Sequence, residues 1–491
     1  MRFAVIGRIL GLMIWLFSAV AFLPAIVVSE LYDESHTSLS SSFYISIFVG
    51  GILFGAASIM RRRMRKQIQR YELRVRDGFI ITVLFWTTLS LLGTLPFALS
   101  EELNISWVDA IFESFSGLTT TGATVISGLD TMERGLLIYR QLLQWIGGIG
   151  IIVIAVAVLP ALGVGGLQLY RSETPGPVKD SKLTPRIAET AKSMASIYIA
   201  LTVACAVSLY ISGMSSFDAI AHALSTTSIG GFSTHDASIG FYDSNTILWV
   251  MTIFMALSGM NFALHFITWQ ENSLRHYFQD SECKFYLSLL AAGTVITVWY
   301  LWLTETLPID DAFYHGAFML VSIATTTGFA TQDFTSWPLF LPFLLFFMAF
   351  VGGSSGSTGG GIKAMRWVLL VRQGQRELYR LVHPNAIRHI KLNRKVVPTR
   401  VLESVWGFIA IYMLTFVMTW LVLMAMGYDF LTAFSAVAAC INNLGPGMGA
   451  VAANYQSLGD GAKLLLSFTM LLGRLEVFTL LVLFTPTFWR D

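Results

Sequence analysis

The chain is poor in charged residues and in cysteine. Only 13% of its 491 residues are charged and 55% are hydrophobic, whereas soluble domains carry about 25% charged residues. The composition therefore excludes an ordinary soluble protein. The three cysteines, Cys205, Cys283 and Cys440, are odd in number and far apart, which excludes a disulfide framework and a CxxC metal site. We expect each of them to be a small buried side chain.

Long apolar runs occur along the whole chain, and ten of them have the length of a membrane-spanning helix. The first run is longer than the apolar core of a signal peptide, and no small-residue cleavage site follows it, so we predict a retained helix. The predicted fold class is thus an all-α polytopic membrane protein. The predicted spans are 3–29, 41–60, 79–100, 140–165, 193–213, 246–269, 285–303, 338–371, 402–427 and 463–487.

Basic residues are unevenly distributed between the predicted spans. Residues 61–78 and 372–400 hold eight Lys and Arg each. Under the positive-inside rule these two segments are cytoplasmic, and ten spans then place both termini in the cytoplasm. A nucleic-acid or lipid patch at 61–78 is the alternative, but its place between two spans favours topology, with no nucleic-acid partner. The segments without Lys or Arg, predicted to be external, are 29–42, 232–246, 303–312 and 329–340.

Four segments of the chain resemble one another around a shared glycine. Their sequences are LTTTGAT (118–124), TSIGGFS (227–233), ATTTGFA (324–330) and INNLGPG (441–447), centred on Gly122, Gly231, Gly328 and Gly445. Small residues stand twelve positions before each glycine, namely Ala110, Ala219, Gly316 and Ala433. Ser116, Ser225, Ser322 and Ala439 stand six positions before it. Self-similarity in a fixed order indicates a repeated architecture.

A short apolar stretch precedes each of these Gly-centred segments and is too short to cross a bilayer. Asp109, Asp218 and Thr432 are suitable N-cap residues for three such half-length helices, and His315 fits the third copy less well. The chain therefore reads as two extra N-terminal helices followed by four pseudo-symmetric units of helix, pore helix, filter and helix around one pore. The predicted boundaries are 1–78 for the N-terminal helices and linker, then 79–170, 171–283, 284–398 and 399–491 for the units.

Irregular backbone at membrane depth must be buried in protein or line a watery cavity. Four such segments most simply converge on one axis, where their carbonyls form stacked rings that replace an ion's hydration shell. The C-terminal ends of the half-helices favour a cation there, without any carboxylate. We expect the threonines to keep the strands extended and Gly328 to bend the chain away. The alternative, ordinary external loops, predicts unrelated lengths and no shared half-helix.

A second unusual segment, GGSSGSTGGG, interrupts the predicted span at 338–371. Each glycine costs about 1 kcal/mol in a helix interior, so we predict that the segment unwinds beneath the filter and acts as a gate. A glycine-rich helix-packing face is the alternative. The predicted gate residues are Gly352, Gly353, Ser354, Ser355, Gly356, Ser357, Thr358, Gly359, Gly360 and Gly361.

Two enzyme motifs overlap this segment. Lys363 follows the glycines, but Ile362 intervenes and the Walker A pattern fails. Residues 352–356 match G-x-S-x-G, which leaves a remote alternative of an intramembrane serine protease with Ser354 or Ser355 as nucleophile and His265 as base. The strand and helix that this motif needs in a soluble α/β sheet are missing. We therefore interpret His265 as a satisfied donor between helices.

The last predicted span buries two charged residues, Arg474 and Glu476. A charged residue in a membrane helix normally faces the interior and has a partner, but two residues apart is poor geometry for a pair on one helix. We hypothesise that Arg474 projects into the pore, contacts residues 352–361 and adds a barrier to cations. A structural salt bridge between spans is the alternative.

Several stretches resemble the membrane subunit of bacterial Trk-type potassium uptake systems, the TrkH/TrkG family, which is related to Ktr and plant HKT transporters. The matching motifs are FESFSGLTTTGAT, IGGFSTHDASIG, GSTGGGIK, RLVHPNA and NNLGPG. The likeness covers essentially the whole chain, including the two extra N-terminal helices and the ending LFTPTFWR.

The resemblance implies potassium ion (K+) as cargo, a location in the bacterial inner membrane and filter ligands that are mainly backbone carbonyls. It also implies an intramembrane gating loop at 352–361 with Arg474 as the pore arginine. The implied filter residues are Thr120, Thr121 and Gly122; Ile229, Gly230 and Gly231; Thr326, Thr327 and Gly328; and Asn443, Leu444 and Gly445. The pair Ile229–Gly230 departs from the Thr-Thr pair of the first and third segments.

The same resemblance implies a homodimer and a soluble, nucleotide-binding regulatory subunit of the TrkA type at the cytoplasmic face. Basic segments 166–192 and 372–400 are available for that contact, and their charge would equally suit lipid headgroups. A sodium-permeable or poorly selective cation transporter and a non-transporting receptor are the remaining alternatives. Passive flow and coupling to protons or sodium both stay open, with Glu113 and Glu476 as candidate acids.

Overall fold

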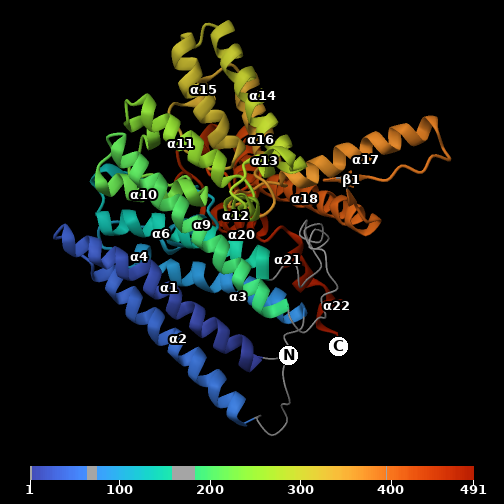
Figure 1. Ribbon diagram of the computed structural model, residues 1–491. Helices are drawn as coiled ribbons and strands as arrows, with labels where there is room; N and C mark the ends of the chain where they lie inside the picture. Colours follow the sequence, from blue (N-terminus) through green and yellow to red (C-terminus); the bar gives the residue numbers. More distant parts are fainter. Residues whose placement is uncertain (1–2, 64–74, 158–182, 394, 491) are drawn as a thin grey trace.

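The computed structural model describes residues 3–63, 75–157, 183–393 and 395–490. Within these residues the protein is almost wholly helical, and its one hairpin pairs β1 (Lys391–Leu392) with β2 (Lys395–Val396). Parts of the three predicted basic segments, namely 64–74, 166–182 and residue 394, lie outside the described residues. Figure 1 shows α1 (Phe3–Leu31) and α2 (Thr37–Arg63) together on one side, and α17 (Ala364–Val382) with the hairpin projecting away from the other helices.

Six helical stretches of the described residues are long and apolar enough to cross a membrane. Two sharply bent helix pairs bring the number to eight if each pair is one span. The predicted span 140–165 corresponds to α6 (Arg134–Ala157) and continues outside the described residues. The helices of the six stretches are α1 (Phe3–Leu31), α2 (Thr37–Arg63), α3 (Val75–Gly93) with α4 (Leu95–Ala98), α9 (Leu183–Ile211), α14 (Ser281–Leu303) and α18 (Thr399–Ala425).

The predicted continuous span at 246–269 is wrong, because α11 (Asn245–Ser258) and α12 (Phe262–Gln270) meet at 94°. The backbone groups freed at this bend are bonded by the glycine-rich segment. The Gly259 carbonyl accepts from the Ser354 N–H at 2.8 Å, and the Phe262 N–H donates to the Gly356 carbonyl at 3.2 Å. A bend inside the protein is therefore tolerated because its polar groups have protein partners.

The predicted continuous span at 463–487 is also wrong. Helix α20 (Asp460–Arg474) ends where Glu476 and Val477 adopt left-handed φ values of 53° and 54°. The chain then continues into α21 (Phe478–Leu481) at 105°. Glu476 is turned toward Arg366 of α17, with which it forms an ion pair. The bend thus separates Glu476 from Arg474, two residues earlier in the chain.

The glycine-rich segment 352–361 is unwound, as predicted. Helix α16 (Phe340–Val351) ends directly before it, and α17 (Ala364–Val382) begins shortly after it. Gly352, Gly356 and Gly361 have φ values between 69° and 79°, which only glycine adopts readily. A continuous helix with a glycine-rich packing face is therefore wrong.

Four short helices lie among the longer ones. These are α5 (Trp107–Leu118), α10 (Ser216–Ser228), α15 (Ile309–Ala324) and α19 (Phe430–Ile441). Their C-terminal halves are almost entirely buried. The remaining α-helices of the described residues are α13 (Arg275–Gln279) and α22 (Pro486–Trp489). The cysteines are free and buried, as predicted.

The predicted caps of α5, α10 and α19 are wrong by about one turn, and the predicted cap of α15 is wrong by about two turns. Ser106 caps α5 and accepts a hydrogen bond from the Asp109 N–H at 3.1 Å, while its hydroxyl donates to the Asp109 carboxylate at 2.9 Å. The Ser106 hydroxyl thus accepts one free N–H of the first turn, as an N-cap residue does. Ser215 and Asp429 cap α10 and α19 in the same position, and Pro308 precedes α15. The residues predicted as caps, including His315, therefore lie inside the helices.

Candidate ion filter and the loop beneath it

The four shared glycines approach one another in a closed cyclic order. In each case, the position that a Cβ would take on the glycine lies against the carbonyl oxygen preceding the glycine of the next segment. The distance from the Cβ position of the glycine to the carbonyl oxygen of the other residue is 2.2 Å for Gly122 and Gly230, 2.0 Å for Gly231 and Thr327, 2.1 Å for Gly328 and Leu444, and 2.6 Å for Gly445 and Thr121. The order runs from the first segment through the fourth and returns to the first. The four segments therefore surround one axis.

Each segment has two residues with left-handed backbone. The shared glycines have φ values of 79° at Gly122, 80° at Gly231, 87° at Gly328 and 98° at Gly445. Two positions earlier, φ is 54° at Thr120, 56° at Ile229, 68° at Thr326 and 54° at Asn443. The expectation that the threonines keep the strand extended is therefore wrong at these positions. Left-handed backbone at a β-branched residue is strained, by about 1–3 kcal/mol.

The left-handed residues close the ends of the short helices. In every segment, the N–H before the shared glycine donates to the carbonyl five residues earlier, as in a Schellman motif. This motif needs a left-handed residue directly after the helix, which explains why β-branched side chains tolerate the conformation here. The four bonds run from Thr121 to Ser116 (2.8 Å), Gly230 to Ser225 (2.9 Å), Thr327 to Ser322 (2.7 Å) and Leu444 to Ala439 (2.8 Å).

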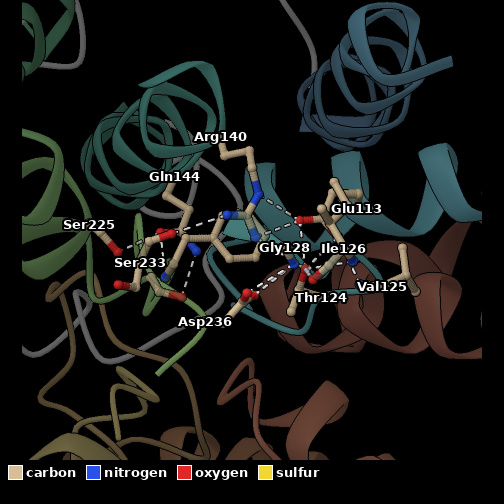
Figure 2. Close-up of polar contacts among 12 residues, drawn as sticks. Glu113, Thr124, Val125, Ile126, Gly128, Arg140, Gln144, Ser225, Ser233 and Asp236 are labelled. Carbon is tan, nitrogen blue, oxygen red and sulfur yellow. Dashed lines mark hydrogen bonds and ion pairs between the residues drawn. The ribbon is translucent and has the colours of Figure 1, made fainter. Parts of the chain in front are cut away.

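A buried ion pair joins the first two segments (Figure 2). Arg140 Nη2 lies 2.8 Å from Glu113 Oε1, and the two side chains are only 1% and 0% exposed. Arg140 Nη1 also donates to the Ser233 carbonyl at 3.2 Å, two residues after Gly231. Glu113 in turn accepts the Val125 N–H at 3.0 Å, three residues after Gly122. The pair therefore connects the residues that follow the shared glycine in both segments to α5 and α6.

The fourth segment has supports of a different kind. Asn443 Nδ2 donates to Thr121 Oγ1 of the first segment and to the Met470 carbonyl of α20, both at 2.9 Å. The Tyr455 hydroxyl donates to the Gly445 carbonyl at 2.8 Å. Sequence reasoning missed Arg140 and Tyr455, because both contacts join positions far from the Gly-centred motifs that carried the prediction.

The segment 352–361 lies against the helix-terminal side of the ring. The Thr358 hydroxyl donates to the Thr227 carbonyl in the last turn of α10 at 3.1 Å. The Gly361 N–H donates to the Asn442 carbonyl at 3.2 Å, and the Gly360 N–H donates to Thr326 Oγ1 at 2.7 Å. The loop therefore contacts the second, third and fourth segments at the ends of their short helices.

Arg474 contacts this loop, as hypothesised. Its Nη1 donates to the Thr358 carbonyl at 2.8 Å and its Nη2 to the Gly147 carbonyl of α6 at 3.0 Å. The side chain is 3% exposed, and no carboxylate among the described residues forms an ion pair with it. Lys363 also donates to the loop, at the Gly359 carbonyl. Two cationic side chains therefore hold the loop through its carbonyl groups.

Glu282 also binds the loop, but as a carboxylate that accepts hydrogen bonds from its N–H groups. Its Oε1 accepts the Ser355 N–H at 2.6 Å and the Met365 N–H at 3.1 Å. The side chain is 2% exposed. One buried carboxylate thus binds the backbone both within the loop and at the start of α17.

His265 does not contact the serines of the loop. Its Nδ1 bonds to the Tyr277 hydroxyl at 2.6 Å and its Nε2 to the Leu257 carbonyl at 2.9 Å. Both ring nitrogens are therefore used between helices, as interpreted from the sequence. Among the described residues, no group of three His, Cys, Asp or Glu side chains could hold a metal ion. The oxygen atoms that lie against the shared glycines are those of the backbone.

A polytopic helical fold whose short helices end in a closed ring of backbone carbonyls defines a membrane transport protein for ions. The model of the TrkH family, described as cation transport protein, matches residues 41–490. The chain belongs to this family. It is therefore a transporter and not an enzyme.

Individual relatives agree with the family match. The chain is 50% identical to the Trk system potassium uptake protein TrkH of Salmonella typhimurium, over the full length of both chains. It is 42% identical to the protein TrkG of Escherichia coli, over 99% of each. The crystal structure of the potassium transporter TrkH from Vibrio parahaemolyticus superposes with a TM-score of 0.91 at 47% identity and covers 100% of both chains.

Proposed function

We propose that this protein takes up potassium across the bacterial inner membrane through the ring of Gly-centred segments. The cyclic approach of each shared glycine to the next segment's carbonyl supports this proposal most directly. Carbonyl oxygens that surround one axis replace the hydration shell of a potassium ion. The relatives named as potassium uptake proteins support potassium as the cargo.

The proposed filter consists of three consecutive residues from each of the four units, with the unit boundaries predicted above. Backbone carbonyls are the main ligands, because side chains differ among the units. The filter residues are Thr120, Thr121 and Gly122; Ile229, Gly230 and Gly231; Thr326, Thr327 and Gly328; and Asn443, Leu444 and Gly445.

Residues 352–361 are the proposed gate. The loop contacts three of the four segments on the helix-terminal side of the ring, and Arg474 holds it in place. A guanidinium at this depth adds an electrostatic barrier to cations. Flux then requires that the loop leaves this position and that Arg474 loses its bond to Thr358.

The proposed partners are a second copy of this chain and a cytoplasmic nucleotide-binding subunit of the TrkA type. Both termini are cytoplasmic in this proposal, as are the basic segments 61–78, 166–192 and 372–400. Helix α17 and the hairpin project from the helical body with several basic side chains and are available for the regulatory subunit (Figure 1).

Growth of a potassium-uptake-deficient bacterium at micromolar potassium tests the proposal. The wild-type chain should restore growth, and Gly328→Ser should not, because a Cβ there would lie 2.1 Å from the Leu444 carbonyl. Failure of the wild type would defeat the proposed function, and equal rescue by Gly328→Ser would defeat the filter assignment.

A sodium-permeable or poorly selective cation transporter is the second candidate. It is favoured by one observation, the unequal side chains before the shared glycine: Thr121, Gly230, Thr327 and Leu444. Growth rescue that sodium abolishes in competition would support this candidate over the first.

A further inference from the structure

The second Gly-centred segment lacks a side chain where the other three have one. Gly230 stands directly before the shared glycine Gly231, at the position of Thr121, Thr327 and Leu444 in the other segments. In the first and third segments, the threonine hydroxyl at this position bonds to the threonine two residues earlier. These bonds are 2.8 Å for Thr121 with Thr119 and 2.7 Å for Thr327 with Thr325.

The conformation of Gly230 does not require glycine. Unlike Gly231, it is not among the residues with positive φ. What requires glycine is the neighbouring side chain of Gln144, from α6. A Cβ on Gly230 would lie 2.3 Å from both Cδ and Oε1 of Gln144, and 2.8 Å from its Nε2. The amide of Gln144 therefore occupies the volume that a side chain at position 230 would need.

Gln144 also forms hydrogen bonds to the segment on both sides of Gly231 (Figure 2). Its Nε2 donates to the Gly230 carbonyl at 2.6 Å. Its Oε1 accepts from the Phe232 N–H at 3.1 Å and from the Ser225 hydroxyl at 2.7 Å. The side chain is fully buried. Rotation of the Gly230 carbonyl would therefore leave a buried amide N–H without its acceptor, which is costly.

The carbonyl that Gln144 holds is part of the ring. The Gly230 oxygen is the atom that lies 2.2 Å from the Cβ position of Gly122 in the first segment. Because α6 follows the first segment in the chain, the bond from Gln144 connects this part of the protein to the second segment.

We propose that Gln144 is a positioning residue for ion selection: its amide replaces the missing side chain at position 230 and fixes the direction of the Gly230 carbonyl. The inference rests on the proposed function of the ring as an ion filter. It explains how the segment that departs from the Thr-Thr pattern keeps an ordered carbonyl.

The reversal potential of the full-length protein in lipid bilayers, with potassium on one side and sodium on the other, tests this role. Gln144→Met keeps the length of the side chain and removes its hydrogen bonds, so the potassium-to-sodium permeability ratio should fall about tenfold. Gln141→Met is the matched control. It removes an equally buried amide of α6 that has no hydrogen-bond partner among the described residues, and the ratio should stay at the wild-type value.

A wild-type ratio in Gln144→Met, together with a reduced ratio in Gly231→Ala, would overturn the role of Gln144 and leave the filter intact. A wild-type ratio in both variants would overturn the filter assignment, and the role of Gln144 with it. The two failures are therefore distinguishable.

A double variant separates positioning from general damage to the fold. Gly230→Thr alone places a Cβ against Gln144 and should lower the ratio. Gln144→Ala with Gly230→Thr removes the obstructing amide and supplies the hydroxyl found in the first and third segments. Its ratio should exceed that of either single variant. A ratio no better than that of Gly230→Thr would contradict the proposal.

Discussion

The guanidinium of Arg474 donates a 2.8 Å hydrogen bond to the carbonyl oxygen of Thr358, from the end of one helix to the middle of the glycine-rich loop. The second donor nitrogen of Arg474 binds the Gly147 carbonyl at 3.0 Å. The loop is thus connected through one side chain to α6, which also provides Arg140 and Gln144 to the ring. Arg474 has no carboxylate partner among the described residues, so no ion pair neutralises its charge.

Arg474→Ala should increase potassium flux. The substitution removes the charge-assisted bond to the Thr358 carbonyl of the loop, the bond to the Gly147 carbonyl of α6, and a positive charge on the proposed ion path. We expect a rise of about tenfold in the flux measured with potassium-loaded vesicles, since loss of about 1.4 kcal/mol corresponds to a factor of ten. Arg474→Lys keeps the charge but cannot span both carbonyls, and should give an intermediate flux. Unchanged or lower flux in Arg474→Ala would count against a barrier.

Glu282→Ala should release the loop, because Glu282 binds the loop at a second place, the Ser355 N–H. The substitution leaves the N–H groups of Ser355 and Met365 without their acceptor, at a cost of about 1–3 kcal/mol for each group. Flux without any regulatory partner should therefore rise. The potassium-to-sodium ratio should stay constant, because the Glu282 carboxylate binds Ser355 and Met365, which lie outside the Gly-centred segments. Glu282→Gln retains an acceptor and should behave like the wild type. A changed ratio with unchanged flux would refute this role.

Loss of the ion pair between Arg140 and Glu113 should destabilise the fold. Removing one partner of a buried pair costs about 3–5 kcal/mol, because the other charge stays buried. Arg140→Met should therefore lower the melting temperature in detergent strongly. Arg134→Met, a change at the exposed start of the same helix, should lower it little. Equal melting temperatures for the two variants would contradict the importance of the pair.

Stability should depend on pH through Glu133. Burial and the neighbouring carboxylates of Glu102 and Glu34 raise the pKa of Glu133 from 4.5 to about 7. An acid with a raised folded-state pKa destabilises the fold above that pKa, and the effect disappears as the pH falls toward the ordinary value. Glu133→Gln should therefore raise the melting temperature at pH 8 and leave it unchanged near pH 4.5. Glu101→Gln, a change at an exposed glutamate next to Glu102 in the sequence, serves as the control. A rise at both pH values for Glu133→Gln would contradict the assignment to Glu133.

The architecture could be predicted because its signals are local in the sequence. The four shared glycines recur at matching places, and each stands where any Cβ would collide with a neighbouring carbonyl. The glycine-rich loop was predictable for a similar reason, since helix interiors do not tolerate such a run. The composition and the length of the apolar runs were enough to predict a polytopic helical protein.

Other features depend on contacts that no local pattern encodes. Thr120 and Thr326 were expected to be extended, but closure of the short helices places them in the left-handed region. The bend between α11 and α12 is possible because the loop at 352–361 bonds its free backbone groups. In the sequence, Gln144 is an ordinary polar residue of a helix, and only the structure shows its hydrogen bond to the Gly230 carbonyl.

The most direct measurement is an anomalous difference map from crystals of this protein grown with thallium in place of potassium. If the ring is a carbonyl filter, a peak lies on its axis, coordinated by backbone carbonyls of the four segments, and Gly328→Ser loses that peak. The nearest carbonyls should be those of Thr121, Gly230, Thr327 and Leu444. Thallium bound elsewhere in the protein, with no peak inside the ring, would contradict the account.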